Sequence, residues 1–491
     1  MRCRLPAMAG LLLPGVLAAA PLGAQQVRVT GASTMRYIEL RPLARDSVAE
    51  DQVPGSGLLR QLPDGRTVRC VPGDPFCRYS RPGERVAAVP LLQDLEASAW
   101  GLGRGVRGFA HLRMRSALGG SAGIWPQEDD AVELLAAYAE LERTRYRIRA
   151  GRQWQVSGLG FYNFDGMNAG GEPVARTWVE VYAGRSLVRG MNESRAGGAL
   201  EAIEEFAPAA HGIIAGAHAR YRPATGVALS ASYQADFRSD GAGLFAELAA
   251  LHASWQGGAA SVEVAVETDV ATLGLNEARV SVHASPRGPV ALHGELRRYR
   301  PYFELWTIWG AFSPVGFDEA RFGATWAASG RRLLFRTDLA HRRYGDAGVA
   351  NSLDEFRGSG WGVLVGGTWL PAPAWRVDGA YRVEAGFGAA RRDGHAGVTR
   401  RLGTAGSLSL QALAFQRLYE FRLDEGTVRG VTAELALPLL PRATLFATGA
   451  AYRHPAGRSG GVDWNQRRGS LRLQWMLGSE PSLPAWNGGG Q

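Results

Sequence analysis

The feature that most constrains this chain is a two-residue alternation of apolar and polar side chains, which recurs from residue 91 to residue 477. The run 470–477 is typical, because its polar positions alternate with the apolar residues Leu471, Leu473, Trp475 and Leu477. Successive side chains of a β-strand point to opposite faces of a sheet. The alternation therefore predicts strands that each have one apolar face and one polar face.

The lengths of the runs and of their connections favour a membrane over a soluble sandwich. The runs extend over 10–14 residues, whereas a soluble strand has roughly 5–6 residues and a tilted membrane strand roughly 9–11. Short turns on one side and long loops on the other are typical of outer-membrane barrels. Short connections fall near 143–145, 222–225, 286–288, 329–331, 371–373, 402–405 and 440–442, and longer ones near 116–130, 157–175, 300–316, 343–355 and 455–466.

These observations predict an all-β fold with a single large antiparallel transmembrane β-barrel over residues 91–480. A closed wall leaves no unpaired edge in lipid, and an even strand number places both chain ends on one side. We expect about 20 strands, within a range of about 18–22. A tail follows over residues 481–491.

Composition and charge exclude other classes of protein. A mean hydropathy of −0.13 is too polar for a bundle of membrane helices, and after residue 24 no apolar stretch approaches the roughly 20 residues that a spanning helix needs. The net charge is +9 and every basic residue is Arg. The Arg residues are scattered singly rather than gathered in basic runs, so no nucleic-acid partner is expected.

The first 90 residues differ from the repeating region. Residues 1–24 have the pattern of a signal peptide: Arg2 and Arg4 precede an apolar stretch, and Ala24 precedes a plausible cleavage point. Residues 25–90 are expected to form an N-terminal segment that lies in the periplasm or acts as a plug. Cys70 and Cys77, an isolated pair in an exported chain, are predicted to form a disulfide.

The polar faces of the predicted strands contain many Arg residues. The pore-lining candidates are Arg113, Arg115, Arg147, Arg149, Gln153, Arg297, Arg336, Arg376, Arg382 and Arg472. A lumen ringed by Arg favours anions, because a low-dielectric wall focuses the potential of fixed charges into the channel. Carboxylates such as Glu133, Glu263 and Asp378 share the same faces. Pairing across strands would then brace the wall and cancel much of that potential, which is the alternative interpretation.

One stretch resembles a known family. Gly151, Arg152 and Gln153 lie in a predicted strand that leads into 157–166, where Phe164, Asp165 and Gly166 follow. This arrangement resembles the alginate-export porins. The resemblance implies a passive pore that is narrowed by a loop, with Tyr162, Phe164, Asp165 and Gly166 as the constriction-loop candidates. There is one departure: Arg152 shares a face with Ile148 and Trp154, so a bulge must re-aim Arg152 or the transfer fails.

These inferences lead to a predicted function. The nine His are dispersed and no clustered Asp/His loop accompanies them, so we predict no catalytic residues, metal site or cofactor. The sequence predicts a porin-like channel of the bacterial outer membrane for passive diffusion of small solutes, with anionic solutes and saccharides as the candidates. A closed or plugged structural or binding barrel is the alternative. The expected partners are membrane lipid, lipopolysaccharide and the barrel-assembly machinery, and the oligomeric state is left open.

Overall fold

The computed structural model describes residues 26–40, 43–63, 67–118, 131–187, 212–237, 243–286, 288–300, 316–330, 332–345, 358–386, 389–403, 406–417, 426–454 and 464–478. Within these residues, 22 strands form one closed antiparallel barrel, as predicted, at the upper end of the expected range. No helix in the described part of the chain is long and apolar enough to cross a membrane. The predicted signal peptide and the tail 481–491 lie outside the described residues.

The wall follows the chain order, with each strand paired to its neighbours in sequence. Its strands are β1 (Gln26–Leu40), β7 (Pro90–Trp100), β8 (Val106–Ala117), β9 (Ala131–Glu142), β10 (Tyr146–Ser157), β11 (Gly160–Val174), β12 (Thr177–Ser186), β13 (Ile213–Tyr221), β14 (Val227–Phe237), β15 (Leu244–Gln256), β16 (Ala260–Asp269), β17 (Gly274–Ala284), β18 (Val290–Tyr299), β19 (Phe317–Ala328), β20 (Leu333–Tyr344), β21 (Ser359–Ala372), β22 (Trp375–Gly386), β23 (Ala389–Leu402), β24 (Gly406–Arg417), β25 (Gly426–Leu440), β26 (Ala443–His454) and β27 (Trp464–Gly478). Closure comes from β1, which pairs with β27 on one side and with β7 on the other.

The alternation in the sequence becomes the two faces of this wall. Large apolar side chains at every second position are exposed, for example Leu251 at 64% and Val431 at 57%. The intervening positions include buried polar groups such as Glu140, Glu180 and Asp338. A globular protein would bury its apolar side chains instead, so this wall is apolar on the outside and polar within. The barrel is therefore of the bacterial outer-membrane kind.

The two ends of the barrel differ in their connections. Turns such as 175–176 and 441–442 are short, and they lie at the end of the wall where β1 begins and β27 finishes. The exposed outward Trp255, Trp326 and Trp369 lie near these short turns, as an interfacial aromatic girdle would. The connections at the opposite end are mostly longer. In bacterial barrels the short turns face the periplasm and the long connections face the outside.

The N-terminal region is organised differently from the expected segment 25–90. β1 belongs to the wall, so the barrel includes Gln26–Leu40, and only the residues between β1 and β7 lie outside it. A short strand, β6 (Val86–Ala88), extends the line of β7 along the end of β1. β1 could not be assigned to the wall from the sequence. A proline-rich stretch separates it from the repeating strands, and its partner β27 lies at the far end of the chain.

The inserted residues form a small sheet of their own. Its strands are β2 (Leu43–Ala49), β3 (Leu59–Gln61), β4 (Thr67–Cys70) and β5 (Phe76–Pro82), with a 3-10 turn at Glu50–Gln52. The predicted disulfide between Cys70 and Cys77 is confirmed; it joins β4 to β5. Both cysteines are buried with Val53 and Val68, and they form most of the small core of this sheet.

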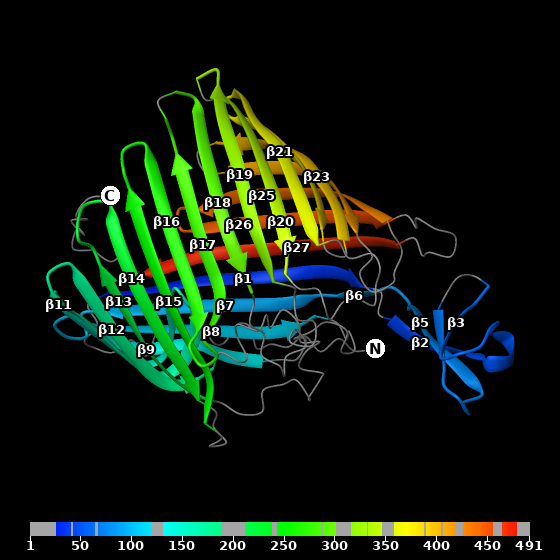
Figure 1. The fold of residues 1–491 in the computed structure, drawn as a ribbon, viewed down its shortest axis with the longest axis horizontal. Coiled ribbons are helices and arrows are strands. Elements are labelled where there is room, and N and C mark those ends of the chain that lie inside the picture. The colour runs from blue at the N-terminus through cyan, green and yellow to red at the C-terminus, as the bar shows by residue number, and fades with distance from the viewer. Residues whose placement is uncertain are drawn as a thin grey trace.

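This small sheet lies beyond the long-connection end of the wall, next to β6 and away from the lumen (Figure 1). The subdomain therefore does not plug the lumen, and the rule that long connections face the outside predicts an extracellular rather than a periplasmic position. It follows from the topology, because β1 must run from the short-turn end to the long-connection end before the insertion begins. We name this sheet, residues 43–82, the cystine subdomain, and it is the first long connection of the barrel.

The topology predicts which segments are accessible from outside the cell. An epitope inserted between Gly55 and Ser56, two exposed residues of the cystine subdomain, should be detected by antibody on intact cells. The matched control is the same epitope between Ala224 and Thr225 in a short turn, which should be detected only after permeabilisation. Antibody access to the control but not to the cystine subdomain would contradict this orientation.

Candidate functional site

The inner wall of the barrel is the candidate functional site. The register places the ten predicted pore-lining residues in phase with buried polar positions and out of phase with the exposed apolar ones. For instance, Arg149 stands opposite Glu140, and Arg472 alternates with the exposed Leu471. All ten are thus on the inner face.

The most enclosed charge on this face is Glu140 of β9, whose side chain is 0% exposed. Its carboxylate bridges two guanidinium groups: Arg149 donates from Nε at 2.8 Å and from Nη2 at 2.6 Å, and Arg107 donates from Nε at 2.5 Å. The Arg149 guanidinium also stacks 4.3 Å from the ring centre of Tyr138. A buried carboxylate is stable only with such compensation. This cluster therefore ties β8, β9 and β10 together.

A second bridge continues along the wall to β12. Arg147 donates to Glu180 at 2.5 Å, and the Asn168 amide donates to the other oxygen of Glu180 at 2.8 Å. The same amide nitrogen donates to Gln155 at 2.9 Å. Strands β10, β11 and β12 are linked by these side chains in addition to their backbone ladders.

Five further predicted arginines have carboxylate partners on the inner face. The pairs are Arg113–Asp94 at 2.8 Å, Arg115–Glu133 at 3.0 Å, Arg297–Glu277 at 3.0 Å, Arg336–Asp338 at 2.7 Å and Arg376–Asp378 at 3.3 Å. Arg–carboxylate pairing across strands offsets the charge of each partner. The pairs of Arg113, Arg115 and Arg297 join two strands and, with those of Arg147 and Arg149, favour the bracing interpretation. The pairs Arg336–Asp338 and Arg376–Asp378 lie within β20 and β22, so they offset charge without joining strands.

The expected constriction loop does not exist as a loop. Residues 157–175 were expected to form a long connection, but Ser157 and Gly160 are joined by a tight turn and 160–174 is strand β11. The four candidates Tyr162, Phe164, Asp165 and Gly166 are therefore wall residues. The glycines and polar residues of this stretch indicated a loop. In the structure, Gly166 stands opposite Gly151 and Gly184, and these small residues fit where three strands pair closely.

The motif residues of this region make structural contacts. Arg152 forms a bidentate ion pair with Asp165, with Nε–Oδ1 at 2.7 Å and Nη2–Oδ2 at 2.8 Å. Gly151 before it has a φ of 125°, but the pairing of β10 with β11 and with β9 continues through this point without a register shift, so no bulge re-aims Arg152 and it stays on the face of Ile148 and Trp154. Gln153 is fully buried, and its amide donates to the Gly166 carbonyl at 3.0 Å.

Phe164 is fully buried in an apolar cluster on the inner face. It packs against Tyr182, with ring centres 5.5 Å apart, and against Ile214. The Tyr182 hydroxyl donates to Gln234 at 2.9 Å. This cluster spans β11 to β14 and excludes water from part of the inner wall. The apolar side chains of this cluster face inward, whereas the sequence pattern predicted polar side chains on the inner face.

The seam where the barrel closes has a different character. Arg36 of β1 stands opposite Ser470 of β27, and Arg468 and Arg472 flank Ser470 on the same face. None of these three arginines has an ion pair in the described part of the chain. Arg468 instead donates to Gln466 at 2.9 Å and lies 5.5 Å from the Tyr452 ring centre. We name Arg36, Arg468 and Arg472 the seam arginines.

The sequence identified only one of the seam arginines. Arg36 was missed because β1 was not assigned to the wall. Arg468 was missed because the alternation in 464–469 is weak, and only Arg472 lies in the strongly alternating part of β27. Their proximity depends on closure, because β1 and β27 lie at opposite ends of the chain.

Known proteins offer limited comparison. No family model and no curated protein matches the sequence. Among solved structures, the chain is similar to the P pilus usher (PapC) translocation pore, with 9% identity, a TM-score of 0.43 and coverage of 91% of this chain and 99% of that one. It is also similar to a BenF-like porin from Pseudomonas fluorescens Pf-5, with 9% identity, a TM-score of 0.41 and coverage of 93% and 100%. Pseudomonas aeruginosa OpdQ is similar at 8% identity, with a TM-score of 0.40 and coverage of 92% and 98%. The function is inferred from this chain's own residues.

The buried bridge predicts a specific loss of stability. Glu140→Gln leaves Arg107 and Arg149 beside an uncharged amide, so the free energy of unfolding should fall by about 3 kcal/mol. Urea unfolding of the barrel refolded in detergent micelles, followed by tryptophan fluorescence, measures this change. Glu142→Gln on the same strand is the matched control, because Glu142 is exposed and lies 3.3 Å from Arg107; it should cost less than about 1 kcal/mol. Equal losses in the two variants would contradict the bridging role of Glu140.

Proposed function

We propose that this chain is a passive diffusion channel of the bacterial outer membrane for small solutes, with a preference for anions. The observation that carries the proposal is the inner wall: a closed barrel that is apolar outside surrounds a lumen lined by charged and polar side chains. Such side chains are stable within a membrane when they face water or partners inside the barrel. A water-filled path is the simplest use of that face.

The width of the barrel supports a path for solutes. Interior space grows with strand number, and barrels of 16–22 strands enclose a lumen that side chains of the wall alone do not fill. The cystine subdomain, the largest described segment outside the wall, lies beyond its end rather than inside it. Among the described residues, therefore, no folded domain occupies the lumen.

The seam arginines support the anion preference. Elsewhere on the inner face most arginines are neutralised by a carboxylate within 2.5–3.3 Å. At the seam, the side chains opposite Arg36, Arg468 and Arg472 on the facing strands are Ser470, Ile38, Ala450, Thr34 and Phe446, all uncharged. A strip of uncompensated positive charge inside a low-dielectric wall attracts anions.

The proposal predicts conductance and its selectivity. The protein refolded into a planar lipid bilayer should show discrete openings with a reversal potential that favours chloride in a KCl gradient. The triple variant Arg36→Gln, Arg468→Gln, Arg472→Gln should lower the chloride-to-potassium permeability ratio by at least about twofold, because it removes charge that has no partner. The reversal potential is the measurement.

A matched control separates seam charge from total charge. Arg113→Gln with Asp94→Asn removes a whole ion pair from the inner face, so its permeability ratio should stay close to that of the wild type. An unchanged ratio in the seam variant would remove these arginines from the filter. The absence of any conductance in the folded wild type, across voltages, would instead favour a closed structural or binding barrel.

A further inference from the structure

A second group of arginines faces outward at the long-connection end of the barrel. Arg392, Arg429, Arg453 and Arg467 lie on β23, β25, β26 and β27, each within a few residues of that end. Their register is in phase with the exposed outward residues: Arg429 precedes Val431 by two positions, and Arg467 precedes Leu471 by four. No register shift separates these positions in the ladders of β22 to β27 up to this end.

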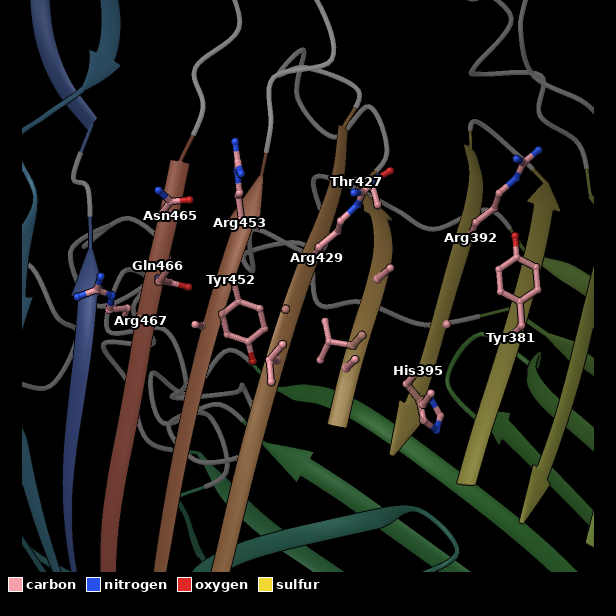
Figure 2. A pocket seen from close by; sticks show the side chains of 18 of the residues that line it. Tyr381, Arg392, His395, Thr427, Arg429, Tyr452, Arg453, Asn465, Gln466 and Arg467 are labelled. Atoms are coloured by element: carbon pink, nitrogen blue, oxygen red, sulfur yellow. The ribbon is translucent and has the colours of Figure 1, made fainter. Parts of the chain in front are cut away.

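The four side chains surround a hollow in the outer surface, and Arg85, from the link between the cystine subdomain and β6, completes its rim. The hollow has a volume of about 1070 Å³. Figure 2 shows Arg392 of β23, Arg429 of β25 and Arg453 of β26 extending toward the long-connection end. The outward residues between them are small and apolar, which creates the depression: Gly394, Ala396, Ala412, Ala414 and Ala451. We name this feature the outer arginine hollow.

The arginine side chains of the hollow are not paired with carboxylates in the described part of the chain. Arg85, Arg392, Arg429, Arg453 and Arg467 have no ion pair with any described residue, in contrast to the braced arginines of the inner wall. Arg429 and Arg453 stand directly opposite each other in the ladder. Like charges in that position repel and destabilise a strand pair.

One carboxylate lies near this rim. The Glu39 carboxylate of β1 accepts a hydrogen bond from the Arg467 backbone N–H at 3.1 Å and one from the Tyr37 hydroxyl at 3.1 Å. It sits at the edge of the hollow beyond β27 and is not paired with the Arg429 and Arg453 side chains. Among the described residues, no carboxylate offsets the repulsion between those two guanidinium groups, so the site favours an anionic ligand.

We propose that the outer arginine hollow binds the phosphate groups of a phosphorylated glycolipid in the outer leaflet of the membrane. Guanidinium groups match phosphate geometry and donate paired hydrogen bonds to it. The orientation of the barrel places the hollow at the outer leaflet, and the side chains face the lipid rather than the lumen. The apolar floor fits acyl chains lying against the wall below the headgroup, which a free phosphate ion would leave uncovered.

The ligand comparison tests the proposal without altering the protein. In detergent solution, the folded wild-type protein should bind bisphosphorylated lipid A at least tenfold more tightly than lipid A without phosphates, as measured by native mass spectrometry. Equal affinity for the two lipids would overturn the proposal. Inorganic phosphate that binds as tightly as the bisphosphorylated lipid would overturn the assignment to a lipid.

Matched variants then locate the site. Arg392→Gln, Arg429→Gln and Arg453→Gln together should weaken binding of bisphosphorylated lipid A at least tenfold. The control replaces Arg222, Arg332 and Arg400 by Gln. This triple variant removes the same amount of charge from the short-turn end, and it should change the affinity less than twofold. Heat-dependent gel mobility reports whether each variant is folded, and the single variant Arg429→Gln serves if the triple variant is not. Wild-type affinity in the folded hollow variant, or an equal loss in the control, would overturn the site. The result is independent of channel activity.

Discussion

Backbone hydrogen bonding in a medium without water is the constraint on which this structure depends. Every N–H and C=O group that faces lipid must be paired within the wall, and strands achieve this only when the sheet closes on itself. Closure here depends on β1, which lies between β7 and β27 and joins the start of the described chain to its end. A strand that the sequence did not assign to the wall is therefore one without which the barrel has two open edges.

Closure also sorts the arginines by environment. On most of the inner wall they are paired with carboxylates on the same strand or on nearby strands, and the buried Glu140 holds two of them at once. At the seam, Arg36, Arg468 and Arg472 face the lumen without a carboxylate partner among the described residues. At the outer rim, Arg429 and Arg453 oppose each other on the lipid side. The same residue type thus braces the wall, supplies lumen charge, or meets the membrane surface, according to the face and the partner that the register provides.

The cystine subdomain and the outer arginine hollow lie next to each other at the long-connection end, because β1 pairs with β27 at the seam. The cystine subdomain leaves the wall from the end of β1, and the outer arginine hollow lies on the strands up to β27, with Arg85 linking the two. A disulfide suits this small sheet, because its apolar core is small and an exported segment meets an oxidising environment. The proposed lipid site would therefore lie next to the cystine subdomain.

The sequence by itself determined the all-β class, the two faces of the wall, most of the strand positions, the disulfide and the inward face of the predicted arginines. These follow from local alternation and spacing, which each strand expresses whatever its partners are. The tertiary structure alone decided that β1 closes the barrel, that 160–174 is a strand rather than a constriction loop, and which arginines have partners. Those outcomes depend on contacts between residues far apart in the chain, such as Arg36 with its neighbours on β27, and no local pattern encodes the register that brings them together.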